Sequence, residues 1–146
     1  MIVFLDTSVW VDDLRHGSLR PLLFRIRSRH LLRFHSVVAA ELLAGCRSKP
    51  ERRALRGLFA PFEATGRMIA PTHTDFLQAA EALSRLRQSG ITLRSPGNAL
   101  MDAVQAATAR RLGSLLVTRN IADFERLRSV MAVAVSSFED FRSRID

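Results

Sequence analysis

The stretch IVFLDTS at residues 2–8 sets four apolar residues directly before an acid and two hydroxyl residues. The apolar run with β-branched members predicts a strand at Ile2–Leu5, and Thr7 and Ser8 are residue types that begin helices. The same alternation of strand and helix continues along the chain, which predicts an α/β fold with a central, mainly parallel sheet. Because ligands bind beyond the carboxyl ends of such strands, Asp6 is the first candidate site residue.

Apolar periodicity and punctuating residues predict the other elements. Further strands are expected at Arg33–His35, Leu115–Val117 and Val130–Val135, with weak candidates within Phe62–Ile69. Helices are expected between Asp6 and Gly17 and at Leu19–Arg29, Val37–Ala44, Glu51–Phe59, Thr72–Gln88, Ala99–Leu112 and Ile121–Leu127, with Ser36 and Asn98 as caps. Ser95–Gly97 is expected to be loop and Phe138–Ile145 a tail. In Thr72–Gln88 the expected buried face is Phe76, Leu77, Ala80, Leu83 and Leu86.

The composition fits one soluble globular domain over residues 1–146, with 47% hydrophobic and 25% charged residues. This apolar content excludes intrinsic disorder. No stretch approaches about 18 uncharged apolar residues, so no membrane span is expected. The start MIVFLD lacks the basic residues and long apolar run of a signal peptide, which favours a cytoplasmic location. The single cysteine, Cys46, excludes an internal disulfide and a zinc site built from cysteines.

The charge points to an anionic partner. The net charge is +8, and 21 of the 22 basic residues are Arg, since Lys49 is the only Lys. The guanidinium group presents a planar fork of donors that suits phosphate, and a pI near 11.5 is typical of nucleic-acid binders. The alternative is a solvated Arg-rich surface produced by the codon preference of a GC-rich genome.

Three acids lie inside apolar runs, namely Asp6 after IVFL, Glu41 within SVVAAELLAG and Asp102 within ALMDAVQAA. A buried carboxylate is costly unless it is paired or bound to metal, and carboxylates that share a site repel one another. A divalent cation removes both problems, and oxygen-only ligation suits Mg²⁺ or Mn²⁺. The alternatives are helix capping by Asp6, an Arg partner for Glu41 or Asp102, and a helix N-terminal role for Asp102 or Asp123.

Three blocks of sequence resemble the signature blocks of PIN-domain ribonucleases: DTSVWVD at 6–12, SVVAAELLAG at 36–45 and DAVQAATARRLGSLLVTRNIADF at 102–124. They occur in the family's order, and the resemblance extends from Met1 to about Val135. It is closest to the VapC-type toxins of bacterial toxin–antitoxin pairs. The resemblance implies a three-layer α/β/α domain, metal-dependent hydrolysis of RNA phosphodiester bonds, an inhibitory cognate antitoxin and a homodimer.

The resemblance also implies roles for individual residues. Asp6 and Asp102 match the direct ligands of Mg²⁺ or Mn²⁺, and Glu41 matches an acid that faces the metal or a bound water. Asp123 matches a fourth acid, and either it or Glu41 would position or deprotonate the attacking water. Small polar residues matched to the site are Thr7, Ser8, Thr118 and Asn120. Gln105 departs from the family pattern, in which an apolar residue is common there.

Arginines around the third block are candidate contacts to RNA phosphates. They are Arg110, Arg111, Arg119, Arg126 and Arg128, of which Arg119 is favoured because it adjoins the end of a strand. The apolar faces of the helices at 19–29 and 37–44 are candidate surfaces for an antitoxin helix, unless they simply pack on the sheet.

Two other classes of protein were weighed. A catalytically silent PIN-fold module, which binds nucleic acid or a protein partner, would lack a site acid, but all three principal acids are present. A receiver-type phosphoacceptor domain would need an adjacent acid pair after the first strand and a Lys after the last, which this chain lacks. Zinc-ligand spacing of histidines, a G-x-S-x-G elbow and nucleotide-binding glycine motifs are all absent from the sequence.

Overall fold

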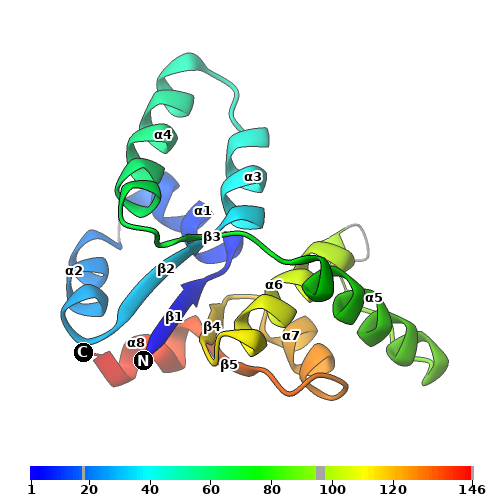
Figure 1. The fold of residues 1–146 in the computed structure, drawn as a ribbon. Coiled ribbons are helices and arrows are strands. Elements are labelled where there is room, and N and C mark those ends of the chain that lie inside the picture. Colours follow the sequence, from blue (N-terminus) through cyan, green and yellow to red (C-terminus); the bar gives the residue numbers. More distant parts are fainter. Residues whose placement is uncertain (18, 95–97, 146) are drawn as a thin grey trace.

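The computed structural model describes residues 1–17, 19–94 and 98–145, so the expected loop at Ser95–Gly97 lies outside the described residues. Within these ranges, five strands form one sheet in the order β3-β2-β1-β4-β5 (Figure 1). The strands are β1 (Ile2–Leu5), β2 (Leu31–His35), β3 (Met68–Ile69), β4 (Leu115–Thr118) and β5 (Ala134–Ser137). All neighbouring strands pair in parallel, which confirms the expected α/β class.

Helices cover both faces of the sheet and give the expected three-layer α/β/α architecture (Figure 1). On one face lie α1 (Thr7–His16), α2 (Arg20–Arg29), α4 (Lys49–Ala64) and α8 (Phe138–Ile145). On the other lie α5 (His73–Gln88), α6 (Ala99–Arg111) and α7 (Ile121–Arg128). Helix α3 (Ser36–Ala44) follows β2 and contributes side chains to both cores. No helix in the described part of the chain is long and apolar enough to cross a membrane.

The two cores follow from the period-two alternation of the strands. In β1, Val3 and Leu5 point into the core beneath α1 and α2, whereas Phe4 points into the core beneath α6. The first core contains Trp10, whose ring stacks on Phe34 with the ring centroids 4.8 Å apart. Because both faces of β1 and β4 are covered, β1 (IVFL) and the first three residues of β4 (LLV) are continuous apolar runs.

The structure differs from the expected elements in four places. Helix α4 is longer than the expected Glu51–Phe59. The Ser48 side chain caps its start by accepting a hydrogen bond from Glu51 N–H, and the helix continues to Ala64. The strand candidates within Phe62–Ile69 therefore reduce to β3, and Phe62 is a helical core residue. The last strand is Ala134–Ser137 and not Val130–Val135, and the expected tail is helix α8.

The expected buried face of α5 was also wrong in part. Phe76 and Leu77 are 40% and 53% exposed, and Ala80 is exposed too. Leu86 is buried as expected, but the other buried residues of the helix are Asp75, Ala79 and Ala82. The small alanines allow α5 to lie close against α6, and a capping box at Thr72 and Asp75 fixes the start of the helix. At the other expected caps, His35 precedes α3 in place of Ser36, and Asn98 precedes α6 without a capping side-chain bond.

Candidate active site

The candidate site lies where the strand order reverses. Strand β1 has β2 on one side and β4 on the other, so the chain leaves the carboxyl ends of β1 and β4 in diverging directions. This topological switch point is the usual place of a ligand crevice in parallel α/β sheets. The residues that follow these two strand ends are Asp6 and Arg119, and Asp6 N–H donates to Val117 O at 2.9 Å.

The Asp6 carboxylate is buried, and one of its oxygens is fixed by hydroxyl groups. Ser8 Oγ and Thr118 Oγ1 donate to Asp6 Oδ2 at 2.7 and 2.9 Å. Among the described residues, Oδ1 receives no hydrogen bond, and the carboxylate makes no side-chain cap on α1. Helix capping therefore does not explain Asp6, and one oriented oxygen remains for a ligand.

Glu41 reaches the same place from α3. Its Oε2 accepts a short hydrogen bond from Thr7 Oγ1, at the start of α1. Burial raises the pKa of the Glu41 carboxyl, the hydrogen bond from Thr7 opposes this rise, and the negative charge of Asp6 adds to it. No Arg of the described ranges pairs with Glu41, so the alternative of a satisfied helix acid is not supported.

Asp102, in the first turn of α6, is the acid with least compensation. It is 8% exposed, and no described side chain forms a hydrogen bond or ion pair with it. Burial raises the pKa of Asp102 to about 7, and repulsion from Asp6, Glu41 and Asp123 adds to the shift. The site therefore holds carboxylates that destabilise one another unless a proton or a cation is present.

Asp123 differs from the other three acids because protein groups neutralise it. The carboxylate is fully buried and accepts from Arg94 N–H and Arg126 Nη1 on Oδ1 and from Asn120 Nδ2 on Oδ2. These bonds tie the start of α7 to the segment before α6. The arrangement suits a positioning role for Asp123 and Asn120 better than direct action on water.

The small polar residues predicted for the site connect the two strand ends. Ser8 Oγ accepts from Arg119 N–H at 3.1 Å, and Thr118 Oγ1 accepts from Asn120 N–H at 2.9 Å. Both hydroxyls also donate to Asp6, so each oxygen links the backbone after β4 to the carboxylate after β1. This explains why hydroxyl residues occur at these positions.

The structure does not bring the predicted phosphate-binding arginines together at the site. Arg119 forms ion pairs with Asp12 and Glu139, both at 2.9 Å, and lies over the Phe138 ring. Arg111 is nine residues beyond Asp102 on α6, about 13 Å along the helix, and binds Asp75. Arg126 and Arg128 pair with Asp123 and Glu125. Arg110 is exposed and forms no ion pair with any acid of the described residues.

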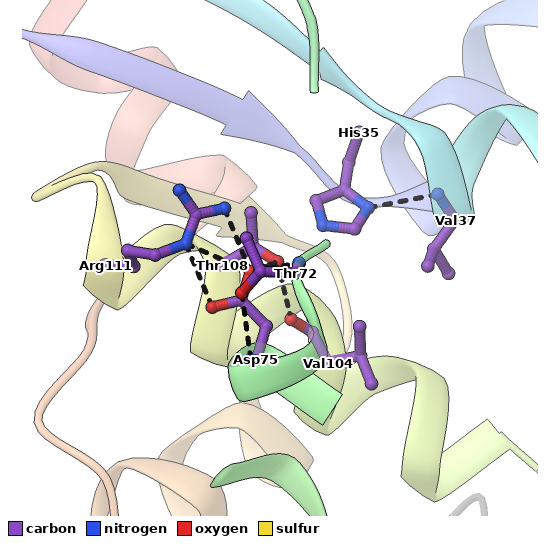
Figure 2. A network of polar contacts seen from close by, with 7 residues as sticks. All are labelled: His35, Val37, Thr72, Asp75, Val104, Thr108 and Arg111. Atoms are coloured by element: carbon purple, nitrogen blue, oxygen red, sulfur yellow. Dashed lines mark hydrogen bonds and ion pairs between the residues drawn. The ribbon is translucent and has the colours of Figure 1, made fainter. Parts of the chain in front are cut away.

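The sequence interpretation missed a buried polar network behind the site (Figure 2). Asp75 is 1% exposed and accepts from Arg111 Nε and Nη2, from Thr108 Oγ1 and from Thr72 N–H. His35 lies beside the network, and its Nδ1 accepts from Val37 N–H. Burial lowers the pKa of His35 to about 4, and Asp75 and Arg111 act in opposite directions on it. The sequence signal that could have drawn attention to Asp75 is the capping pattern of Thr72 followed three residues later by Asp75.

The donor set fits a hydrated divalent cation. In residues 1–17, 19–94 and 98–145, no three His, Cys, Asp or Glu side chains lie close enough to enclose an ion by themselves. Mg²⁺ does not require this, since it retains several waters and is commonly held by one or two carboxylates. The free oxygen of Asp6 and the uncompensated carboxylate of Asp102 provide such ligands.

Similar proteins agree with this reading of the fold. The family described as PIN domain matches residues 3–129. No curated protein matches the sequence. The fold is similar to that of VapBC2 from Rickettsia felis bound to a DNA fragment from their promoter, with a TM-score of 0.70, 21% identity and coverage of 94% of this chain and 99% of that one.

Two further solved structures share the fold. VapBC-1 from nontypeable Haemophilus influenzae has a TM-score of 0.71 and 19% identity, with coverage of 95% of this chain and 99% of that one. FitAcB from Neisseria gonorrhoeae has a TM-score of 0.67 and 22% identity, with coverage of 91% and 95%. Since the family match covers most of the chain, the protein belongs to the PIN domain family.

Proposed function

We propose that this protein is a metal-dependent endoribonuclease, the VapC-type toxin of a VapBC-like toxin–antitoxin pair that acts in the cytoplasm. The observation that carries the proposal is the group of acids at the switch point, of which Asp6, Glu41 and Asp102 have no cationic partner among the described residues. The net charge of +8 supports a polyanionic substrate. The likeness to VapBC structures supports a toxin of this class.

In this mechanism Asp6 and Asp102 would hold Mg²⁺ or Mn²⁺. When bound, such an ion polarises a phosphoryl oxygen and lowers the pKa of a coordinated water. The hydroxyls of Ser8 and Thr118 keep Asp6 Oδ2 fixed, so the carboxylate presents Oδ1 without reorientation. Asn120 and Asp123 hold the neighbouring backbone in place.

Glu41 is the proposed general base. Its carboxyl is half-buried and its pKa is raised, so it accepts a proton more readily than an ordinary carboxylate does. The hydrogen bond from Thr7 orients one oxygen and leaves the other for the attacking water. One proton of the water passes to Glu41 as the water oxygen bonds to phosphorus. The bond between phosphorus and the ester oxygen breaks, and that oxygen takes a proton from solvent.

A cognate antitoxin is the proposed protein partner. Of the two apolar faces expected to receive it, that of α2 packs in the core through Leu22 and Ile26. The helix α3 buries Val38 in the same core, but its Leu42 also lines a groove of about 510 Å³ between α1, α3 and α4. Glu41 lines it together with Val11, Leu14, Cys46 and Leu55, so an antitoxin segment in this groove would block the acid site.

A homodimer is also proposed, through the exposed apolar side chains of α5 and α6. Phe76, Leu77 and Leu100 are 40%, 53% and 44% exposed. A second copy that covers them would remove apolar surface from water. Light scattering of the wild type and of a Phe76→Ser, Leu77→Ser variant tests this. The wild type is expected to have the mass of a dimer and the variant that of a monomer, and equal masses would contradict the proposal.

Cleavage of total cellular RNA tests the proposed activity. The purified protein, freed of antitoxin, is incubated with Mg²⁺, Mn²⁺ or EDTA, and the Asp6→Asn variant is assayed beside it. Glu81→Gln is the matched control, because Glu81 is an exposed acid on α5 and its loss changes the charge equally. Discrete fragments that require metal and Asp6, but not Glu81, support the proposal. Cleavage that persists in Asp6→Asn contradicts it, and RNA binding without cleavage favours the silent module.

A further inference from the structure

Arginines without a carboxylate partner among the described residues lie at the amino ends of the strands, opposite the acids. Residues 14–40 contain six Arg and no Asp or Glu. Among the arginines predicted to contact phosphate, Arg111, Arg119 and Arg126 are all neutralised by carboxylates. At the amino ends of the strands, Arg27 and Arg29 form no ion pair with any acid of the described residues.

These arginines line a hollow beside the amino ends of β1 and β2. The hollow has a volume of about 470 Å³, and its polar lining includes Arg27, Arg29, His30 and Arg67. A second hollow of about 120 Å³ shares Arg27 and Arg67 and continues over Phe62 at the end of α4. Because the two hollows share both arginines, they form one cationic depression, here called the arginine hollow.

The side chains of the arginine hollow are held in place by the fold. Arg29 Nη1 donates to Ile145 O at 3.0 Å, and within the described residues its other N–H groups form no hydrogen bond. The Arg27 guanidinium lies over the Phe62 ring, 5.6 Å from its centroid. His30 Nδ1 is buried and has no hydrogen-bond partner within the described part of the chain. Fixed donors lose less conformational entropy on binding a ligand than free surface arginines do.

An exposed aromatic ring lies on α2, one helical turn before Arg27 of the hollow. Phe24, on α2, is 76% exposed, the most of any large apolar side chain in the described ranges. Arg20 is four residues before it and Arg27 three residues after it, so the three share one stripe of the helix surface. An aromatic ring flanked by arginines is the arrangement that binds single-stranded nucleic acid, by base stacking and phosphate contact.

We infer that the arginine hollow and Phe24 form a second binding site for single-stranded RNA, in which Arg27, Arg29 and Arg67 contact phosphates and Phe24 stacks on a base. The inference rests on the proposed RNA substrate and adds a site remote from cleavage. The hollow lies at the amino ends of the strands and the acids at the carboxyl ends. These two ends are separated by the length of β2, whose five residues span about 16 Å. A structured RNA can therefore contact the hollow while another of its segments lies at the acids.

RNA affinity measured in EDTA tests the inference without requiring cleavage. The probe is a fluorescent single-stranded RNA, and its anisotropy is followed over a range of salt concentrations. The variant is Arg27→Gln, Arg29→Gln, Arg67→Gln, and the matched control is Arg53→Gln, Arg56→Gln, Arg87→Gln, which removes the same charge from exposed positions of α4 and α5. Thermal denaturation checks folding, and a variant that retains Arg29 avoids the loss of its bond to Ile145.

The hollow variant is expected to bind RNA roughly tenfold or more weakly at low salt, with the slope of log K against log salt reduced by about 2. Phe24→Ala is expected to weaken binding with an unchanged slope. An equal loss of RNA affinity in the control triple variant would overturn the inference. Two other results would also overturn it: inorganic phosphate that binds with the same affinity as the RNA and displaces it, or phosphatidylserine vesicles that bind more tightly than the RNA.

The proposed nuclease and the inferred site fail in distinguishable ways. If the wild type cleaves RNA and the hollow variant binds RNA as the wild type does, the inference fails and the nuclease stands. If the hollow variant loses affinity while no condition gives cleavage, the site stands and the nuclease fails.

Discussion

Asp75 and Asp102 are two buried acids with opposite electrostatics. Burial by itself would raise the pKa of Asp75, but hydrogen bonds from Arg111, the Thr72 backbone and Thr108 outweigh it, so the pKa is lowered. Burial and three neighbouring acids raise the pKa of Asp102 to about 7. Burial therefore does not identify a functional acid in this fold. The informative difference is the neutralising cation, which Arg111 provides for Asp75 and which no described residue provides for Asp102.

The largest expected effect comes from removing the cation from Asp75. Arg111→Gln leaves a buried carboxylate without its ion pair, and we expect it to lower the free energy of unfolding by about 3 kcal/mol. This figure is at the lower end for a buried pair because the Arg111 side chain is 35% exposed. Chemical denaturation measures the change, with Arg110→Gln as the exposed neighbouring control. Equal stability of the two variants would show that Asp75 does not need Arg111.

The opposite behaviour is expected when the negative charge of Asp102 is removed. Its pKa is raised in the folded state, so the folded protein binds the proton more tightly than the unfolded chain does. The associated stability is complete below about pH 4 and is lost as the pH rises through about 7. Without metal, Asp102→Asn should therefore be more stable than the wild type at pH 8, by roughly 2–3 kcal/mol, and the difference should shrink toward pH 5. Urea denaturation at both pH values measures this, and a difference independent of pH would contradict it.

A smaller effect sharpens the description of the Asp75 network. Thr108→Val removes the hydroxyl that donates to Asp75 at 3.1 Å but keeps the side-chain volume. The expected loss in the free energy of unfolding is about 1 kcal/mol, since Arg111 still neutralises the carboxylate. In the Arg111→Gln background the same change should cost more. A double-mutant cycle measures the coupling, and strict additivity would mean that the two donors act independently.

The smallest effect is expected at Gln105, one turn beyond Asp102. Gln105 is 1% exposed, and neither polar atom of its amide has a hydrogen-bond partner among the residues described. Gln105→Leu should raise the free energy of unfolding by up to about 1 kcal/mol, because it removes unsatisfied polar groups. RNA cleavage should remain close to that of the wild type. A large loss of cleavage would instead assign Gln105 to the acid site.

Local signals in the sequence were sufficient to predict that Asp6, Glu41 and Asp102 lie close enough to repel one another. Asp6, Glu41 and Asp102 each interrupt an apolar run, and the rule for parallel sheets placed the strand ends together. Asp75 was missed because it lies in a polar helix start and its partner, Arg111, is 36 residues further along the chain. A pairing of this kind leaves no local pattern.

The errors in the predicted secondary structure also arise from contacts between residues far apart in the chain. The apolar run at Val130–Val135 suggested a strand, but the strand begins where Ala134 pairs with Leu115 of β4. Similarly, the apolar residues Phe76 and Leu77 suggested a buried face of α5, which is instead set by the close approach of α6. Tertiary contacts decided both, and local propensity did not indicate them.

The central claim is that no side chain of the described residues neutralises Asp6, Glu41 or Asp102 and that a bound divalent metal ion does so. The thermal stability of the protein, measured with and without Mg²⁺, tests this claim most directly. The wild type and the Glu81→Gln control should both gain melting temperature on addition of Mg²⁺ at pH 8, because the ion binds the folded state. Asp102→Asn should start from a higher melting temperature and gain little. An equal gain in Asp102→Asn, or no gain in the wild type, would contradict the assignment of this site as a metal centre.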